Sequence, residues 1–350
     1  MYIEGIEMGD FNAVSAKMSK MTSEFLTDRD YISMSRFQTV SEIITYLKEN
    51  TKLSSYFDGY EDSYEAERKL DLYKLDLLTK LRHYYKGNYL NFVNAAISEF
   101  EIDDIKRVLR YLKTKDGRRS LKDRLIVLNS DNLIEENDTI KTFVEKLKGT
   151  KYYKVLRQYV DDAEDVVLFY MEMNLDKLYY QQLVEISNTF SKAEKQKVDE
   201  VLGVKIDLLN ITWIYRGIKY YGLMPEELLN FAVIGGKVFN FDRLREMVYM
   251  DIEKEFVPYI LNSHYEFLFQ GESQDIYLDR RSSRFLYYTC REVFKRDFFD
   301  FSKFAAFMYI LDFEVKDIRG IMEATRFNLS PGETLNYLVR SYKGSELTWL

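Results

Sequence analysis

Apolar residues recur at helical spacing in three separate segments of this chain. Counted from Ile102, the apolar residues of the first segment stand at offsets 0, 3, 7 and 10. Counted from Leu208 and Val315, the same offsets hold mostly apolar residues in the other two segments. The positions are Ile102, Ile105, Leu109 and Leu112; Leu208, Ile211, Tyr215 and Ile218; and Val315, Ile318, Met322 and Thr325. This spacing predicts amphipathic helices that pack one face against their neighbours. We call the three expected helices the marker helices.

Each marker segment carries a related motif. It reads Glu101-Ile-Asp-Asp-Ile-Lys106, Asp207-Leu-Leu-Asn-Ile-Thr212 and Glu314-Val-Lys-Asp-Ile-Arg319. Asp104 and Asn210, the fourth residues of the first two copies, are 106 residues apart, and Asn210 and Asp317 are 107 apart. Such regular spacing indicates one structural unit used three times. We expect the first and fourth side chains of each motif to accept hydrogen bonds inside their own domain.

A second stripe runs beside the apolar one, at offsets 4, 8 and 11. Seven of its nine residues are basic. Six of them are candidates for contact with a protein partner: Arg110, Lys113, Arg216, Lys219, Arg319 and Arg326. In one interpretation this basic stripe lines an opening and meets acidic or polar residues of the partner. In the other it is a solvated helix face whose local ion pairs contribute little energy.

The second and third marker helices are followed by a similar turn. It reads Gly222-Leu-Met-Pro-Glu-Glu227 in one and Asn328-Leu-Ser-Pro-Gly-Glu333 in the other. Gly or Asn suits a left-handed helix end, and the Pro and Glu that follow suit the start of another helix. We predict an all-α fold of three similar domains, 1–116, 117–222 and 223–350. The period of about 106 residues is too long for a solenoid of short repeats.

Composition agrees with an all-helical chain. The 350 residues include three prolines and fifteen glycines, fewer turn residues than a β-sandwich or barrel needs. The net charge of −7 speaks against nucleic acid as a general partner. We expect Cys290, the single cysteine, to be a small buried hydrophobe. We expect neither a signal peptide nor a membrane span, since no apolar run approaches the roughly 20 residues that cross a bilayer.

Signatures of catalysis are weak. Gly235-Gly-Lys237 resembles the end of a phosphate loop, but Phe231 and Val238 stand where that motif needs Gly and Ser or Thr. The two histidines, His83 and His264, lack the spacing of metal ligands. Acidic pairs are usually solvated on acidic helical proteins, so a metal-dependent hydrolase has little support. We expect no enzyme activity, no cofactor and no metal.

Two further basic groups stand outside the stripe. One consists of Arg118, Arg119, Lys122 and Arg124, and the other of Arg280, Arg281 and Arg284. Both are compatible with ordinary exposed loops. They are equally compatible with surfaces that approach the cytoplasmic loops of a membrane partner or anionic lipid head groups, since each basic residue near such a surface contributes about 1 kcal/mol.

The repeated motif and several longer stretches resemble the C subunit of V-type and A-type rotary ATPases, which is the d subunit of the eukaryotic complex. The stretches are Val204-Lys-Ile-Asp-Leu-Leu-Asn-Ile211, Arg216-Gly-Ile-Lys-Tyr-Tyr-Gly-Leu-Met-Pro-Glu-Glu227 with Gly235-Gly236, and Phe313-Glu-Val-Lys-Asp-Ile-Arg319. The resemblance covers essentially the whole chain and is strongest over 200–240 and 300–340. It is looser in the first third.

The resemblance implies a funnel of three similar helical domains with pseudo-threefold symmetry. It implies a peripheral, non-catalytic subunit on the cytoplasmic side of the membrane, which couples the central shaft to the rotor ring and transmits torque for ATP-linked proton or sodium transport. The implied partners are the shaft subunits of D and F type and the ring proteolipid, with no nucleic acid or small-molecule substrate. The alternative is an all-helical repeat adaptor unrelated to rotary ATPases.

Overall fold

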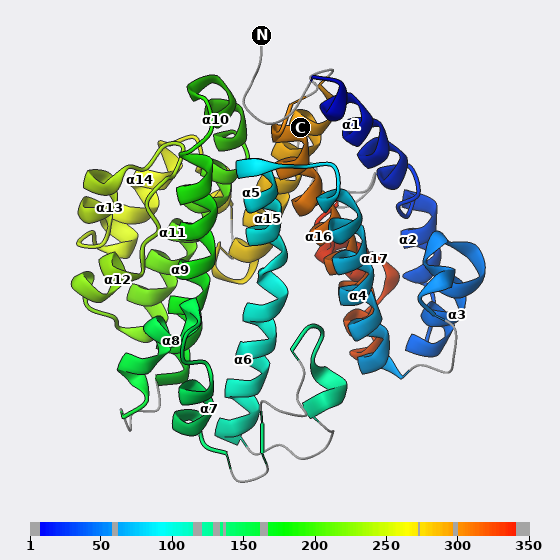
Figure 1. The fold of residues 1–350 in the computed structure, drawn as a ribbon, viewed down its shortest axis with the longest axis horizontal. Coiled ribbons are helices and arrows are strands. Elements are labelled where there is room, and N and C mark those ends of the chain that lie inside the picture. The colour runs from blue at the N-terminus through cyan, green and yellow to red at the C-terminus, as the bar shows by residue number, and fades with distance from the viewer. Residues whose placement is uncertain are drawn as a thin grey trace.

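The computed structural model describes residues 8–57, 62–114, 121–128, 134–135, 138–161, 167–271, 274–296 and 300–340. Throughout these ranges the regular secondary structure is helical, without a β-strand, which confirms the all-α prediction. The longer helices run beside one another through the middle of the molecule, and shorter helices cover two flanks (Figure 1).

Three helical hairpins form the centre, and each ends with a marker helix. Hairpin 1 consists of α4 (Ser63–Arg82), α5 (Gly87–Ile97) and α6 (Glu99–Thr114); hairpin 2 of α9 (Val167–Ser187), α10 (Lys192–Asp199) and α11 (Leu202–Arg216); hairpin 3 of α15 (Gln274–Lys295) and α16 (Ser302–Arg326). The predicted repeat therefore appears as three similar pairs of long helices.

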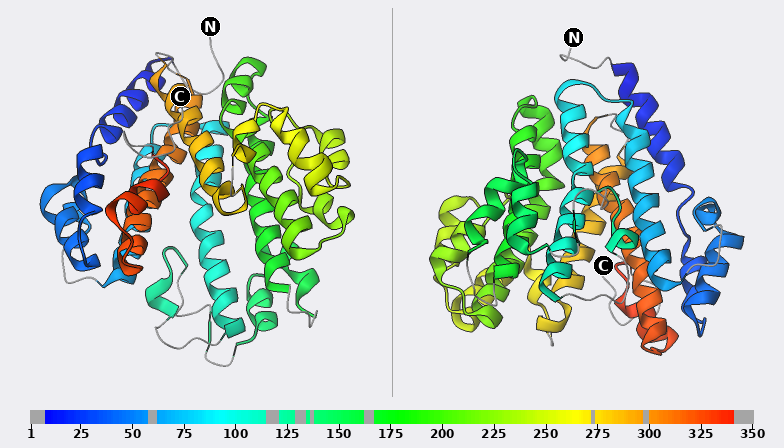
Figure 2. Two further views of the ribbon diagram at one scale, coloured as in Figure 1. Left: turned by 180° about the vertical axis from the view of Figure 1, so that it is seen from behind. Right: turned by 60° about the horizontal axis from the view of Figure 1, so that its bottom comes forward.

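Short helices connect and flank the hairpins. They are α1 (Met8–Thr22), α2 (Asp28–Met34), α3 (Val40–Asn50), α7 (Ile140–Lys146), α8 (Lys151–Leu156), α12 (Pro225–Phe231), α13 (Phe241–Met247), α14 (Val257–Leu261) and α17 (Pro331–Tyr337). Single turns of 3₁₀ or π helix lie at Lys52–Ser55, Leu121–Arg124, Arg157–Tyr159, Gly217–Tyr221, Ile252–Phe256 and Glu266–Phe269. Both views of Figure 2 place α1 to α3 on one flank and α12 to α14 on the opposite one.

The marker helices form because their apolar stripes enter the core. Ten of the twelve positions in the three stripes are buried, and the two others, Ile218 and Thr325, lie near the C-terminal helix ends and are partly exposed. The turns behave as predicted. Gly222 and Asn328 adopt left-handed backbone angles, with φ of 59° and 54°, and Pro225 and Pro331 begin the helices that follow.

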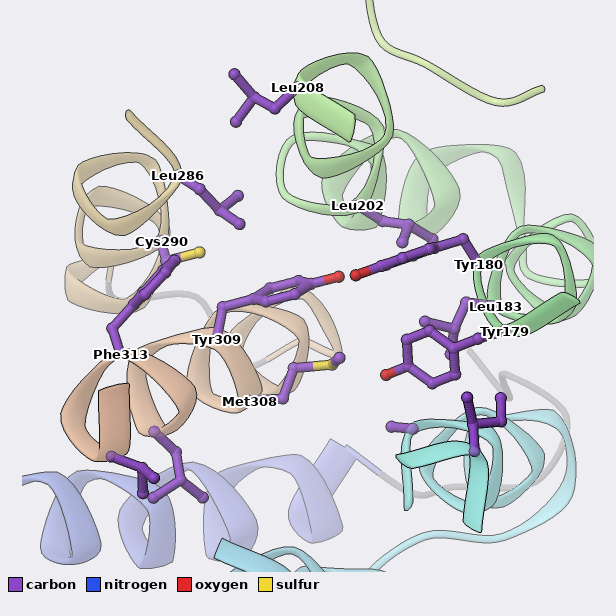
Figure 3. Close-up of a cluster of buried hydrophobic side chains, with 14 of the residues drawn as sticks. Tyr179, Tyr180, Leu183, Leu202, Leu208, Leu286, Cys290, Met308, Tyr309 and Phe313 are labelled. Atoms are coloured by element: carbon purple, nitrogen blue, oxygen red, sulfur yellow. The ribbon is translucent and has the colours of Figure 1, made fainter. Parts of the chain in front are cut away.

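One continuous hydrophobic core joins all three hairpins. Figure 3 shows a part of it in which side chains of α9, α11, α15 and α16 meet, and in which the hydroxyl groups of Tyr180 and Tyr309 point toward one another. Cys290 of α15 is fully buried there, as predicted. Because the hairpins share this core, it does not reveal where one domain ends and the next begins. The three predicted domain ranges stay a prediction, and the boundary at 116 lies outside the described residues.

At the end of the molecule where the hairpins turn, aromatic rings pack together. We call this cluster the plug; its members are Phe11, Tyr85, Tyr89, Phe92, Phe190, Phe301 and Phe304. All three hairpin turns contribute, with ring centroids of Tyr89 and Phe190 4.9 Å apart and those of Tyr89 and Phe301 5.0 Å apart. Large rings with few rotatable bonds make this end of the assembly stiff.

Candidate partner-binding surface

The first residue of each repeated motif accepts a hydrogen bond from a tyrosine. Tyr152 donates to Glu101, Tyr265 donates to Asp207 over 2.6 Å, and Tyr31 donates to Glu314 over 2.9 Å. These tyrosines come from the short helices and turns that precede α9, α15 and α4. The third bond joins residues 283 positions apart, so the last hairpin closes onto the beginning of the chain.

The fourth residue of each motif holds a downstream segment. Asp104 accepts the backbone N–H groups of residues 126–128, Asn210 exchanges two hydrogen bonds with the backbone of Val233, and Asp317 accepts the N–H of Val339 over 2.6 Å. In all three repeats, the first backbone N–H group bound in this way belongs to a residue 22 or 23 positions after the fourth motif residue. We call these downstream segments the straps: residues 125–128, 230–233 and 336–340.

A basic residue on the first long helix of each hairpin donates a hydrogen bond to a backbone carbonyl group of the strap that the marker helix of that hairpin also binds. Arg68 donates to the carbonyl of Leu125, Lys177 to that of Asn230, and Arg284 to that of Leu338. Arg280 adds a bond to the carbonyl of Asn336. Each strap is thus fixed from both sides, because the first helix supplies a donor and the marker helix supplies an acceptor.

This arrangement excludes an exposed loop, which was one of the two interpretations left open for Arg280, Arg281 and Arg284. They lie on α15, where Arg281 and Arg284 are buried and Arg284 is only 1% exposed. Burial and, to a smaller extent, the neighbouring Arg284 lower the pKa of Arg280 to about 10. Backbone carbonyl groups at the end of α17 and just after it accept hydrogen bonds from Arg280 and Arg284. In the other basic group, Arg118 and Arg119 lie outside the described residues.

The motif residues therefore satisfy backbone and side-chain donors, as expected, but most donors lie across the predicted domain boundaries. Tyr152 and Val233 belong to the range after that of their acceptors, and Tyr31 belongs to the first range whereas Glu314 belongs to the third. The physical reason is that each strap packs back onto both long helices of the hairpin that precedes it, and in the first two repeats this strap lies beyond the predicted domain boundary. Burial raises the pKa values of Asp207, Glu314 and Asp317, the last to about 6, against the opposing effect of their hydrogen bonds.

The basic stripe connects neighbouring hairpins. Arg110 of α6 donates two hydrogen bonds to Glu172 of α9, 2.6 and 2.7 Å long. Arg216 of α11 pairs with Asp279 of α15 over 2.7 Å. Hairpin 3 is linked back to hairpin 1 by two further ion pairs, both between α16 and α4. Arg319 pairs with Asp71 over 2.6 Å, and Arg326 pairs with Glu67 over 2.5 Å.

Lys113 and Lys219 of the stripe are exposed, as are Arg110 and Arg326, whereas Arg216 and Arg319 are half-buried. Lys113 is near the end of α6, and Lys219 donates to the hydroxyl group of Tyr215 over 3.0 Å. Arg110 also keeps 57% of its side-chain surface accessible while it pairs with Glu172. The stripe thus braces the hairpins, while some of its members keep a surface that a partner could touch. Contact between the stripe and a partner stays a prediction.

Sequence reasoning missed the carboxylates that pair with the stripe. Glu67, Glu172 and Asp279 stand on the first long helix of each hairpin, at separations of 105 and 107 residues. Their spacing matches that of the motif, so a comparison of acidic positions across the three copies could have found them. At the centre, Lys74 of α4 lies 2.7 Å from carboxylate oxygens of both Glu99 of α6 and Asp312 of α16.

Two hollows open at the end of the molecule away from the plug, where the marker helices finish. The first, of about 910 Å³, follows α16 from Asp312 to Phe327 and reaches α17 and Val339. The second, of about 540 Å³, lies between the beginning of α4 and the end of α6. Arg319 lines both, so the two hollows adjoin.

Arginine, carboxylate and apolar side chains line the two hollows. Among the residues that the structure describes, no group of three or more His, Cys, Asp and Glu side chains is placed to hold a metal ion. Nor does any described helix combine the length and hydrophobicity needed to cross a membrane. The structure is thus a closed series of three hairpins, linked by ion pairs, with hollows at one end.

Comparison with known proteins defines the class further. The family model described as ATP synthase (C/AC39) subunit matches residues 14–337, so this chain belongs to that family and is a rotary ATPase subunit. It is similar to the C subunit of the A-type ATP synthase from Methanosphaera stadtmanae, with 19% identity over 93% of this chain and 86% of the relative. The corresponding subunit from Methanocaldococcus jannaschii is 23% identical over 95% and 87%. That from Pyrococcus horikoshii is 24% identical over 63% and 60%.

Proposed function

We propose that this chain is the non-catalytic socket between the central shaft and the membrane rotor ring of an A-type or V-type ATPase. In that role it transmits torque between ATP turnover on other subunits and the transport of protons or sodium ions through the ring. Its partners are the D-type and F-type shaft subunits on one side and the ring proteolipid on the other. It sits as a peripheral protein on the cytoplasmic face of the membrane.

The observation that carries this proposal is that the ion pairs between the hairpins form a closed circle. Ion pairs link hairpin 1 to 2, hairpin 2 to 3 and hairpin 3 back to 1. A ring closed in this way resists twisting, because rotation of any one hairpin relative to the others strains contacts at two junctions. The predicted three-part funnel with pseudo-threefold symmetry agrees with this order.

The position of the hollows supports this proposal. They open where the marker helices end, and Arg110, Arg319 and Arg326 of the stripe lie at or beside them. The plug closes the other end with packed rings. We propose that the shaft enters at the hollow end and that the stripe contributes positive charge to its seat.

The test is a pull-down of the tagged chain from native membranes solubilised in a mild detergent, with mass spectrometry of the proteins that co-purify. Recovery of the shaft subunits together with the ring proteolipid supports the socket. Recovery of soluble partners alone contradicts it and favours the helical adaptor.

A further inference from the structure

Three arginines on α15 have no part in the proposed function. Arg284 is one helical turn from both Arg280 and Arg281, so the three side chains lie on one side of the helix. Arg284 is 1% exposed, Arg281 is 6% exposed and Arg280 is half-buried. We call these three residues the arginine cluster. Like charges withdrawn from water are costly unless an opposite charge accompanies them.

Arg280 and Arg284 donate to uncharged acceptors. Arg280 binds the backbone carbonyl of Asn336, and Arg284 binds the carbonyl groups of Asn336 and Leu338. Within the described part of the chain, neither guanidinium group forms an ion pair with a carboxylate, whereas the arginines of the basic stripe that link the hairpins all do. Backbone carbonyl groups satisfy hydrogen bonds but supply no negative charge.

The surroundings of the arginine cluster leave its positive charge unbalanced. Burial lowers the pKa of all three guanidinium groups, and the charge of Arg284 contributes further to lowering that of Arg280 to about 10. The negative charge of Asp317 opposes the effect of burial on the pKa of Arg284 without reversing it. Both oxygens of Asp317 already accept backbone N–H groups, from Val339 and Arg340. An anion from solution can supply the missing charge.

One edge of the Arg280 guanidinium group is available for such an anion. Nη1 binds the carbonyl of Asn336, but Nε is buried and has no hydrogen-bond partner, and Nη2 forms no hydrogen bond among the described residues. Nε and Nη2 together form the fork that binds two oxygens of one oxyanion. The flat faces are taken, because the guanidinium carbon lies 4.2 Å from the ring centre of Tyr277 and 5.6 Å from that of Tyr337.

Tyr337 gives access to this edge. Its side chain is 52% exposed and lines the first hollow, so its ring can turn toward solvent without disturbing the core. The more buried side of the cluster is formed by Arg281 and Arg284. A small ion can enter such a site, whereas a membrane surface cannot reach side chains that are 6% and 1% exposed.

We propose that the arginine cluster binds a phosphate ion, which Arg280 holds through Nε and Nη2 and whose charge balances those of Arg281 and Arg284. Because the cluster also binds the carbonyl groups of residues 336 and 338, the bound ion fixes the third strap in place. The site lies within this chain alone, so the inference does not depend on the coupling role proposed above.

The test is calorimetric titration of the full chain with inorganic phosphate, with chloride at equal ionic strength as the reference. Arg280→Gln removes the fork and is expected to weaken phosphate binding by about tenfold or more, since two charge-assisted hydrogen bonds are lost. Arg245→Gln is the matched control. Arg245 lies on α13, is 57% exposed and pairs with Asp242, and its substitution is expected to leave phosphate binding unchanged.

A second variant keeps the test decisive if Arg280→Gln does not fold. Arg280→Lys retains a positive charge and a donor for the carbonyl of Asn336 but cannot make the two-pronged contact, so it is expected to weaken phosphate binding several-fold. Circular dichroism without phosphate checks that each variant is folded. Phosphate stabilises folded proteins in general by exclusion from their surface, so a rise in the unfolding midpoint counts only as far as the Arg280 variants lose it.

The outcomes are distinct. Saturable phosphate binding that the unaltered chain and Arg245→Gln share, and that the Arg280 variants lose, supports the site. Lack of saturable binding by the unaltered chain, or equal binding by all variants, overturns it. Co-sedimentation with phosphatidylcholine vesicles, with and without phosphatidylglycerol, examines the other source of phosphate groups. Binding to the anionic vesicles that requires Arg280, without binding of the free ion, would assign the cluster to a membrane surface and overturn the inference.

Discussion

Tyr31 of α2 donates its phenolic hydrogen to Glu314 of α16 over 2.9 Å, although 283 residues separate them along the chain. Leu26 donates its backbone N–H to the other oxygen of the same carboxylate, and Arg340 pairs with it as well. Glu314 is 1% exposed, so its hydrogen bonds are shielded from solvent. The beginning and the end of the chain therefore meet at one buried carboxylate, which closes the circle of hairpins.

The Tyr31→Phe substitution tests this closure. It keeps the ring and removes one donor from a buried carboxylate, so we expect the free energy of unfolding to fall by about 1–3 kcal/mol. Urea denaturation followed by circular dichroism measures the change. Tyr249→Phe is the control, because the hydroxyl of Tyr249 also donates to a carboxylate, that of Glu226, but is exposed. A loss as small as that of the control would contradict a closing role for Tyr31.

The Asp317→Asn substitution tests the hydrogen bonding between Asp317 and the third strap. Asn210 occupies the equivalent position in the second repeat and binds its strap through both amide atoms. We therefore expect Asp317→Asn to be tolerated at neutral pH within about 1 kcal/mol, whereas Asp317→Ala leaves the amide of Val339 unpaired and costs about 1–3 kcal/mol. Thermal and urea unfolding of the two variants distinguish the cases.

The pH dependence of stability follows from the pKa of Asp317, which burial raises to about 6. An unfolded aspartate titrates at about 3.9, so the folded state binds a proton more tightly than the unfolded state does. The contribution of Asp317 to stability is therefore greatest below about pH 4 and declines as pH rises through about 6. Asp317→Asn lacks this titration, so the unaltered chain should lose unfolding free energy relative to that variant over this window. A difference independent of pH would contradict the assignment.

Arg319 and Arg216 belong to the same stripe, but they should differ in how much each contributes to the free energy of unfolding. Arg319 pairs with Asp71, a buried residue, and also donates to the carbonyl of Glu67. Arg216 pairs with Asp279, whose side chain is 55% exposed. We expect Arg319→Ala to cost about 1–3 kcal/mol and Arg216→Ala less than about 0.5 kcal/mol, since exposed ion pairs are screened by water. Urea unfolding at low and at high salt measures both, and equal losses would refute this ranking.

Reversal of two charges tests the proposed torque path. We expect Arg216→Glu combined with Lys219→Glu to uncouple ATP hydrolysis from ion transport while the subunit stays folded, since both side chains lie at the end of α11 beside the exposed Tyr220. Ion pumping and ATP hydrolysis are measured together in vesicles reconstituted with the whole complex. Arg245→Glu, on the outer helix α13, is the control. Unchanged coupling in the double variant would count decisively against a role of this part of the stripe.

Local signals in the sequence were sufficient to place the helices and to count the repeats. Apolar spacing located the three marker helices, and Gly222, Asn328 and the following prolines located their ends, because these signals act over a few residues. The family could also be inferred, since its motifs are short runs of neighbouring residues. The burial of Cys290 followed from residue type alone.

The contacts of those residues became known only from the way the hairpins pack. The basic stripe was visible in the sequence, but its pairing with Glu67, Glu172 and Asp279 depends on which hairpin stands next to which. The motif carboxylates were expected to bind within their own domains, whereas Glu314 binds Tyr31 at the far end of the chain. Contacts of this kind depend on the closure of the ring of hairpins. No periodicity along one helix encodes that closure, because it results from packing between segments distant in sequence.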